Sequence, residues 1–184
     1  KVNLEHAVIV RRIFAAFAQG LSPKRIAHTL NHDGMAGPSG SAWAASTIYG
    51  NWRRGPGIIN NELYIGRLIW NRQQYVKAPT TGKRQARPNP ENKWIIEEVP
   101  HHRIIDQELW DRVKTRQSTS RSRVITDTDG IRSERARRPR YLLSGLLRCG
   151  ICGGGFSKIS QHHYGCSTAR NKGICDNRMT IRRE

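Results

Sequence analysis

The chain has 184 residues and carries 32 lysines and arginines against 14 acidic residues, a formal net charge of +18. A protein this basic is attracted to polyanions, of which nucleic acid is the most common and an acidic membrane surface is the alternative. The sequence contains no run of 18 apolar residues and no basic amphipathic helix with a broad apolar face, so we expect no membrane partner.

The first two predicted helices have clear start and stop signals. Asn3 is a candidate N-cap for a helix over Leu4–Gln19, and Gly20 supplies its end. Ser22 and Pro23 then have the residue types of an N-cap and a first helical residue. The second helix places Ile26, Ala27 and Leu30 on one face and ends at Gly34. Both helices therefore have an apolar face to bury.

A third helix is predicted from about Ala44 to Arg53. Three short helices with glycine-rich breaks are typical of a helix-turn-helix arrangement, although other small helical cores share the pattern. The polar face and end of the third helix offer side chains that reach phosphates and base edges: Ser46, Thr47, Tyr49, Asn51, Arg53 and Arg54. A solvated helix end is the alternative, but the net charge favours DNA contact.

Strands are expected after the helices. The alternation within Glu62–Lys77 predicts strands, and Lys93–Pro100 is typical of a returning strand. The polar, proline-rich stretch Ala78–Asn92 between them is predicted to be a mobile loop. Its Lys83 and Arg84 either lie along a phosphate backbone or serve only to keep the loop solvated.

A fourth helix over Ile104–Gln117, capped by Asp106, is followed by a basic linker over residues 118–140, where the apolar pattern disappears. Arginine suits DNA grooves and phosphates because its guanidinium is planar. We expect DNA contacts from the far end of this linker, with an unstructured tether as the alternative. The candidate residues are Arg135, Arg137, Arg138 and Arg140.

The four cysteines all follow residue 148: Cys149, Cys152, Cys166 and Cys175. The first two have the C-x2-C spacing of a metal knuckle, and the 13 residues before Cys166 leave room for a short hairpin. Four thiolates suit one structural, tetrahedral Zn²⁺ ion with no open catalytic position. Zinc would also stabilise residues 142–177, whose apolar content is small.

Two other uses of the cysteines are disfavoured. A redox pair requires a βαβ setting that the sequence lacks, and a disulfide pair requires an oxidising compartment without a signal peptide to reach it. A reducing cytoplasm fits better. Nearby basic residues add candidate DNA contacts: Lys158, Arg170 and Lys172.

Three blocks of this sequence resemble the C-terminal half of the large serine site-specific recombinases of the resolvase/invertase superfamily. The first covers Glu5–Asn31. The second covers Trp43–Tyr75 and continues over Glu97–Gln117. The third covers Arg138–Lys158 and His162–Ile181. The likeness extends over nearly the whole chain, although NWRRGPGIINNELYIG is longer than the turn found at that point in many relatives.

The resemblance implies a recombinase domain followed by a zinc β-ribbon, with the four cysteines as zinc ligands. It places the nucleophilic serine, which forms a 5′-phosphoserine link, in an N-terminal domain ahead of this chain. We therefore expect no catalytic residue here and an inactive fragment of a bacterial or phage-encoded, nucleoid-associated protein. The parent protein is expected to act as a dimer on each site and as a tetramer in synapsis.

The sequence predicts an α+β fold in three parts: a recombinase domain over 1–117, a basic linker over 118–140 and a zinc ribbon over 141–184. The predicted function is sequence-specific binding of double-stranded DNA at recombination sites. A stand-alone zinc-ribbon regulator of DNA or RNA is the alternative. A metal-dependent nuclease built on His101–His102 or His162–His163 is disfavoured because no carboxylate cluster accompanies either pair.

Overall fold

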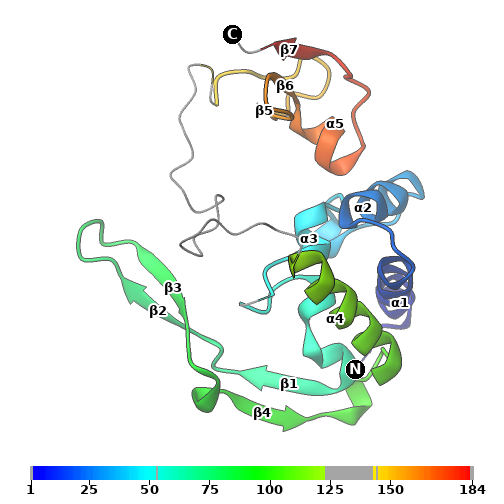
Figure 1. Ribbon diagram of the computed structural model, residues 1–184, viewed down its shortest axis with the longest axis vertical. Helices are drawn as coiled ribbons and strands as arrows, with labels where there is room; N and C mark the ends of the chain where they lie inside the picture. The colour runs from blue at the N-terminus through cyan, green and yellow to red at the C-terminus, as the bar shows by residue number, and fades with distance from the viewer. Residues whose placement is uncertain (1, 53, 123–142, 144, 183–184) are drawn as a thin grey trace. The chain divides into compact units, whose positions relative to one another are not determined.

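The computed structural model describes residues 2–52, 54–122, 143 and 145–182, which form short helices and small antiparallel sheets (Figure 1). The predicted α+β class is confirmed. The chain divides into two compact units, Lys1–Leu21 with Ser46–Lys114 (the first unit) and Ser22–Ala45 with Thr115–Glu184 (the second unit). Within the described residues, no helix is long and apolar enough to cross a membrane.

Helix α1 (Leu4–Ala18) begins where the sequence predicts. The Asn3 side chain accepts hydrogen bonds from the backbone N–H groups of Glu5 and His6, which would otherwise lack helical partners. Phe14 is fully buried in the first unit, with its ring stacked 5.7 Å from that of Trp110. These aromatic rings form part of the first unit's core.

Helix α2 (Pro23–His32) also follows its predicted signals. Ser22 Oγ accepts from the backbone N–H of Arg25, and Pro23 occupies the first turn. The predicted apolar residues Ile26, Ala27 and Leu30 are all buried. Further along the second unit, the Asn31 amide makes hydrogen bonds of 2.9 and 2.7 Å with both backbone groups of Trp43.

Helix α3 (Ala45–Tyr49) is shorter than predicted, so the expected extension to residue 53 is wrong. Gly50 has a φ of 56°, which ends the helix. A Cβ on Gly50 would collide with the backbone of Pro56, and a Cβ on Gly57 would lie 2.6 Å from the Gly50 Cα. The backbone therefore closes on itself here, forming what we call the Gly50–Gly57 loop.

The strands of the first unit form two antiparallel pairs. β1 (Arg67–Trp70) pairs with β4 (Ile95–Glu98), the predicted returning strand, and β2 (Gln73–Lys77) pairs with β3 (Arg84–Pro88). The prediction of a loop over Ala78–Asn92 is thus partly wrong, because residues 84–88 in the middle of that stretch form β3. Residues 62–65, expected to begin a strand, form a 3₁₀ helix.

Helix α4 (Gln107–Ser122) continues into the stretch expected to be linker. Trp110 and Val113 are buried, so this helix packs its apolar side chains into the core of the first unit. Residues 123–142 lie outside the described part of the chain, so the linker beyond α4 and its expected end at residue 140 stay predictions.

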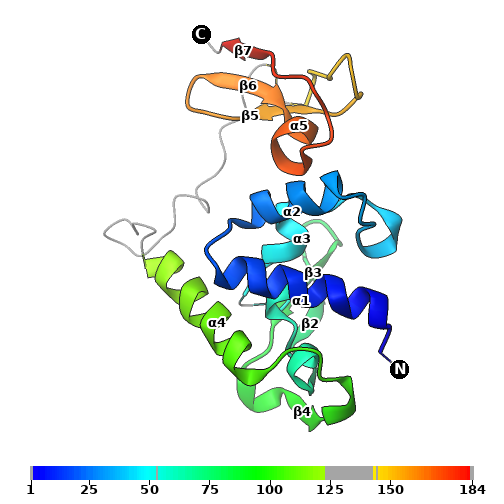
Figure 2. The same cartoon turned by 90° about the vertical axis from the view of Figure 1, so that its right-hand side faces the viewer.

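The C-terminal part of the second unit, residues 145–182, contains a three-stranded sheet, and we call this whole part the ribbon. β5 (Phe156–Lys158) pairs with β6 (His163–Cys166), confirming the expected hairpin, and β7 (Thr180–Arg182) pairs with the other edge of β6. Figure 2 shows helix α5 (Ser167–Lys172), which follows β6 directly, beside this sheet. Neither α5 nor β7 was predicted.

Candidate metal centre and nucleic-acid interface

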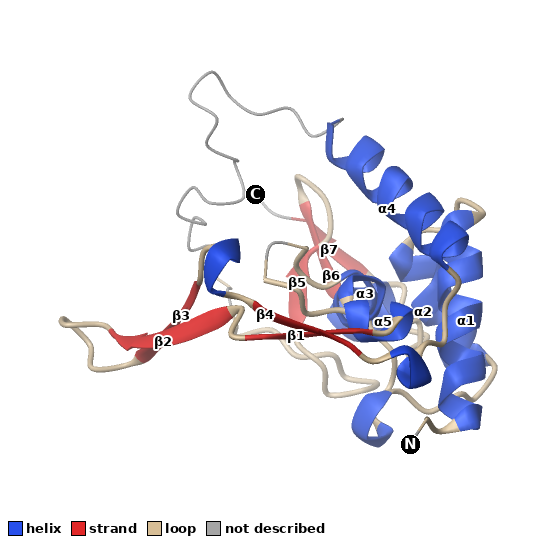
Figure 3. Ribbon diagram, turned by 90° about the horizontal axis from the view of Figure 1, so that it is seen from below, coloured by secondary structure: helices blue, strands red, loops and turns tan. Residues whose placement is uncertain are grey.

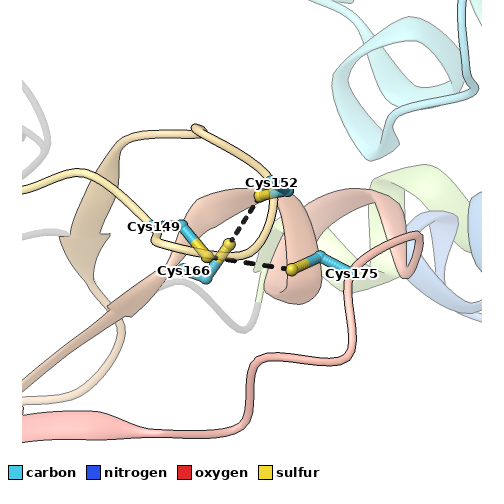
Figure 4. A group of neighbouring side chains, drawn as sticks. All are labelled: Cys149, Cys152, Cys166 and Cys175. Carbon is cyan, nitrogen blue, oxygen red and sulfur yellow. Dashed lines mark hydrogen bonds between the residues drawn. The ribbon is translucent and has the colours of Figure 1, made fainter.

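The four predicted metal ligands come together in the ribbon. Their sulfur atoms all lie within 4.8 Å of one another, and they are the only such group found among the described residues (Figure 4). The Sγ atoms of Cys149 and Cys175 are 3.9 Å apart, and those of Cys152 and Cys166 are 3.6 Å apart. Residues from the knuckle, the end of β6 and the segment after α5 therefore converge on one point.

These distances fit a tetrahedral metal site. Four sulfurs bound at about 2.3 Å to one ion at the centre of a tetrahedron lie about 3.8 Å from one another. The Cys149–Cys175 and Cys152–Cys166 sulfur distances, 3.9 and 3.6 Å, lie close to that value. With all four positions taken by cysteine, the site has the donor set of a structural metal and leaves no position for a catalytic water.

Backbone and amide N–H groups support thiolates at this site. The Asn177 side-chain amide donates to Cys149 Sγ at 3.1 Å and lowers the pKa of that thiol to about 6. The backbone N–H of Gly154 lowers the pKa of Cys152. Although the backbone N–H of Asn177 favours the thiolate of Cys175, burial and the neighbouring sulfurs raise its pKa to about 12. Four thiolates this close repel one another, and a divalent cation compensates for that repulsion.

A second candidate surface lies at the end of α3 in the first unit. Ser46, Thr47 and Asn51, three of the predicted DNA contacts, line an open hollow of about 550 Å³ together with residues of the Gly50–Gly57 loop. Arg54 is exposed on the same loop. Tyr49 differs, because it is half-buried and its ring lies 6.4 Å from that of Phe17. This surface offers hydroxyl, amide and guanidinium groups to a ligand.

A polar network beneath this surface was not predicted from the sequence. The Asn60 side chain donates to the carbonyl oxygens of Tyr49 and Pro56, at 2.7 and 3.0 Å. Lys114 Nζ donates to Asn60 Oδ1 and to the carbonyl of Ile59. Burial lowers the pKa of Lys114 to about 8. The network ties the end of α3, the Gly50–Gly57 loop and α4 together, and no local sequence pattern indicates it.

Replacing Asn60 with Ala should lower the free energy of unfolding by about 2 kcal/mol, because Tyr49 O loses its donor and Lys114 loses an acceptor. Urea denaturation followed by tryptophan fluorescence measures the change. The exposed Asn92 provides the matched control, since Asn92→Ala should leave the midpoint unchanged. Equal midpoints for the two variants would show that the network contributes nothing.

The remaining predicted DNA contacts are spread over both units. Arg84 begins β3, and Lys83 lies in the exposed turn before it. On the ribbon, Lys158 and Arg170 are exposed and Lys172 is half-buried. Five other predicted contacts fall outside the described residues: Arg53, Arg135, Arg137, Arg138 and Arg140.

The His101–His102 pair, weighed as a nuclease site, consists of two rings 4.2 Å apart. No histidine joins the cysteine cluster, the one group of at least three possible metal ligands found in the described part of the chain.

Two protein-family models agree with this arrangement. The family model described as "Recombinase" matches residues 4–120, and the model described as "Recombinase zinc beta ribbon domain" matches residues 142–184. A solved structure titled "Crystal Structure of a LSR-DNA Complex" matches at 22% identity with a TM-score of 0.39.

This match covers 98% of the present chain and 50% of the other, so the chain spans about half the length of that protein. No curated protein matches the chain significantly. The two family matches confirm the resemblance predicted from the sequence blocks. The chain belongs to the recombinase family and carries that family's recombinase domain followed by its zinc β-ribbon domain.

Proposed function

We propose that the chain is the DNA-reading part of a serine recombinase. It binds double-stranded DNA sequence-specifically at recombination sites and does not itself cut the strands. One Zn²⁺ ion, held by Cys149, Cys152, Cys166 and Cys175, stabilises the ribbon. The serine nucleophile, the dimer on each site and the synaptic tetramer belong to the whole recombinase in this proposal.

The observation that carries the proposal is the surface at the end of α3. Ser46, Thr47 and Asn51 line an open hollow, and the exposed Arg54 lies on the adjoining loop. Hydroxyl and amide groups exchange hydrogen bonds with base edges, whereas arginine binds guanine and phosphate. The Asn60 network holds this surface in place without using the side chains that face outward.

The charge of the chain supports the same conclusion. A net charge of +18 provides the sequence-independent attraction to phosphates that DNA binding requires. The α3 surface would supply base contacts, while the linker arginines and the basic residues Lys158, Arg170 and Lys172 on the ribbon would add phosphate and groove contacts. In this proposal, the side chains that recognise base edges are therefore different from those that attract the phosphates.

A binding experiment tests the proposal. The chain should bind a duplex that carries the recombination site at the end of the mobile element encoding it, as expected for a serine recombinase. We expect this binding to be at least about a thousandfold tighter than binding to a random duplex or an RNA duplex of equal length. Fluorescence anisotropy at one fixed salt concentration measures all three affinities. Equal affinity for the three ligands would contradict sequence-specific DNA reading and favour a general nucleic-acid binder.

A control addresses cutting. Incubation with supercoiled plasmid and Mg²⁺ should leave the plasmid intact, because the proposed metal site is closed by four cysteines. Nicked or linear plasmid produced by the purified chain would contradict the proposal and support the alternative hypothesis of a metal-dependent nuclease.

A further inference from the structure

The β2–β3 hairpin, residues 73–88, is a feature that the proposed surfaces do not explain. We call it the arm. Figures 1 and 3 show it extending from the β1–β4 pair, away from α1. Almost every residue of both strands is exposed, including Tyr75 at 69% and Val76 at 47%. A two-stranded hairpin with neither face buried is marginally stable by itself, so the arm gains little from the packing of its own side chains.

The charges on the arm have one sign. No Asp or Glu occurs between Glu62 and Glu91, whereas the arm carries Lys77, Lys83, Arg84 and Arg87. Lys77 and Arg84 lie directly opposite each other in the strand register. Like charges at opposed positions destabilise a hairpin. In the described residues, none of the four forms an ion pair with a carboxylate. This arrangement opposes folding and favours an anionic partner.

The root of the arm, by contrast, is firmly held. Asn89 is buried, and its amide donates to the carbonyl oxygen of Asn71 at 2.9 Å and to its side-chain oxygen at 3.1 Å. Asn71 has a φ of 61°, a conformation that asparagine tolerates better than most residues. Arg72 forms an ion pair with Glu62 and lies over the Trp94 ring, 4.9 Å from its centre. The root therefore fixes the direction of the arm, although both faces of the arm itself are exposed to solvent.

The distribution of charge between the two faces indicates the shape of the partner. Side chains alternate between faces along a strand, so Arg87, three residues after Arg84, lies on the face opposite Arg84 and Lys77. A flat anionic surface, such as a membrane, would meet one face only. A groove between two phosphate backbones places negative charge next to both faces of the arm. The major groove of B-form DNA is about 12 Å wide and admits a two-stranded β-ribbon, whereas the deep, narrow major groove of A-form RNA does not.

We propose that the arm enters the major groove of duplex DNA, with Lys77 and Arg84 on one phosphate backbone and Arg87 on the other. The proposal rests on the proposed DNA-binding function and adds a contact surface that is separate from the α3 hollow. Each five-residue strand is about 17 Å long, so the arm is long enough to span several base pairs within the groove.

The test is the double variant Lys77→Ala/Arg84→Ala, measured by anisotropy on the duplex from the element's end over a range of salt concentrations. Losing two phosphate contacts should make the slope of log K against log[salt] shallower by about 1.8, and affinity at 0.1 M salt should fall roughly 50-fold. The thermal midpoint should stay the same or rise, because the variant removes a repulsive pair. A purely structural role would instead lower the midpoint.

Two further variants make the result specific. Lys93→Ala/Arg112→Ala removes two exposed positive charges outside the arm and should keep the wild-type slope. The exchange Lys77→Arg/Arg84→Lys keeps both charges and should bind as the wild type does. Dimethyl sulfate footprinting reports guanine N7 in the major groove. The wild type should protect guanines that the Lys77→Ala/Arg84→Ala variant leaves reactive.

Three outcomes would overturn the inference: an unchanged slope in the arm variant, an equal loss in the Lys93/Arg112 control, or an unchanged footprint. If the wild type binds the duplex and the arm variant matches it, only the arm inference fails. If the wild type binds no duplex, both the proposed function and the arm inference that rests on it are wrong.

Discussion

Stripping the metal with a strong chelator should unfold the ribbon and leave the first unit folded. The buried hydrophobic cluster of the ribbon consists of Cys149, Cys166, Cys175 and Ala169, with Phe156 packed against it. Three of these four buried residues are proposed metal ligands, so the core and the metal site are the same structure. Zinc binding contributes about 10–16 kcal/mol in small zinc peptides, which is as large as the whole free energy of unfolding of a typical domain, about 5–15 kcal/mol.

The apolar residues around the ribbon offer no replacement for the metal. Ile151, Ile174, Met179 and Ile181 are between 41% and 78% exposed. Without the ion, the cysteines would take up protons, and four neutral thiols would replace the strong metal–sulfur bonds with weak hydrogen bonds. The expected loss is therefore complete unfolding of the ribbon and not a modest shift in its stability.

NMR amide dispersion, followed residue by residue during chelation, measures this loss. Signals from residues 145–182 should collapse to random-coil positions, while those of α1 and β1–β4 stay in place. Cys149→Ser should reproduce the collapse without chelator. His162→Ala supplies the control, since this exposed neighbour lies outside the cysteine cluster and its removal should leave metal and fold intact. A ribbon that keeps its dispersed signals after metal loss would refute the metal's structural role.

Affinity for duplex DNA should fall on the order of a thousandfold between 50 and 200 mM monovalent salt. Each neutralised phosphate releases counterions and contributes about −0.9 to the slope of log K against log[salt], so about six contacts give this drop. The chain has enough charge for that number, with 18 more basic than acidic residues. Basic candidates lie on the Gly50–Gly57 loop, the arm and the ribbon.

Anisotropy titrations at five or more salt concentrations give the slope directly, and it should be −5 or steeper. Circular dichroism at the same concentrations provides the control, because the folded state should not change over this range. A slope shallower than about −2 would mean that most of the positive charge serves solubility instead of DNA binding.

The sequence predicts elements well where a single residue type determines the local backbone. Asn3 and the Ser22–Pro23 pair set the starts of α1 and α2, since their side chains satisfy helix N–H groups whatever lies around them. The cysteine spacing likewise anticipated the set of sulfurs that converge, because thiolates at these intervals have few other uses in a chain of this kind.

Prediction failed where distant backbone segments decide the outcome. The sequence predicts the third helix to continue to about Arg53, but it ends at Gly50, where the backbone of Gly57 approaches closely. β3 contains Pro88 and follows a Pro- and Gly-containing turn, so its composition is typical of a loop, yet pairing with β2 makes it a strand. Lys114 and Asn60 meet across more than fifty residues of sequence, beyond the reach of any local signal.

The closure between Gly50 and Gly57 has a consequence for engineering this protein. The backbone N–H of Asn51 donates to Pro56 O at 2.9 Å, so a hydrogen bond joins the two ends of the segment between the glycines. Gly55 belongs to this closure as well, because it has a φ of 87° and a Cβ there would collide with the Arg72 guanidinium. The exposed Arg54 is therefore the position where we expect an exchange to alter the proposed DNA contacts with the least change to the backbone beneath.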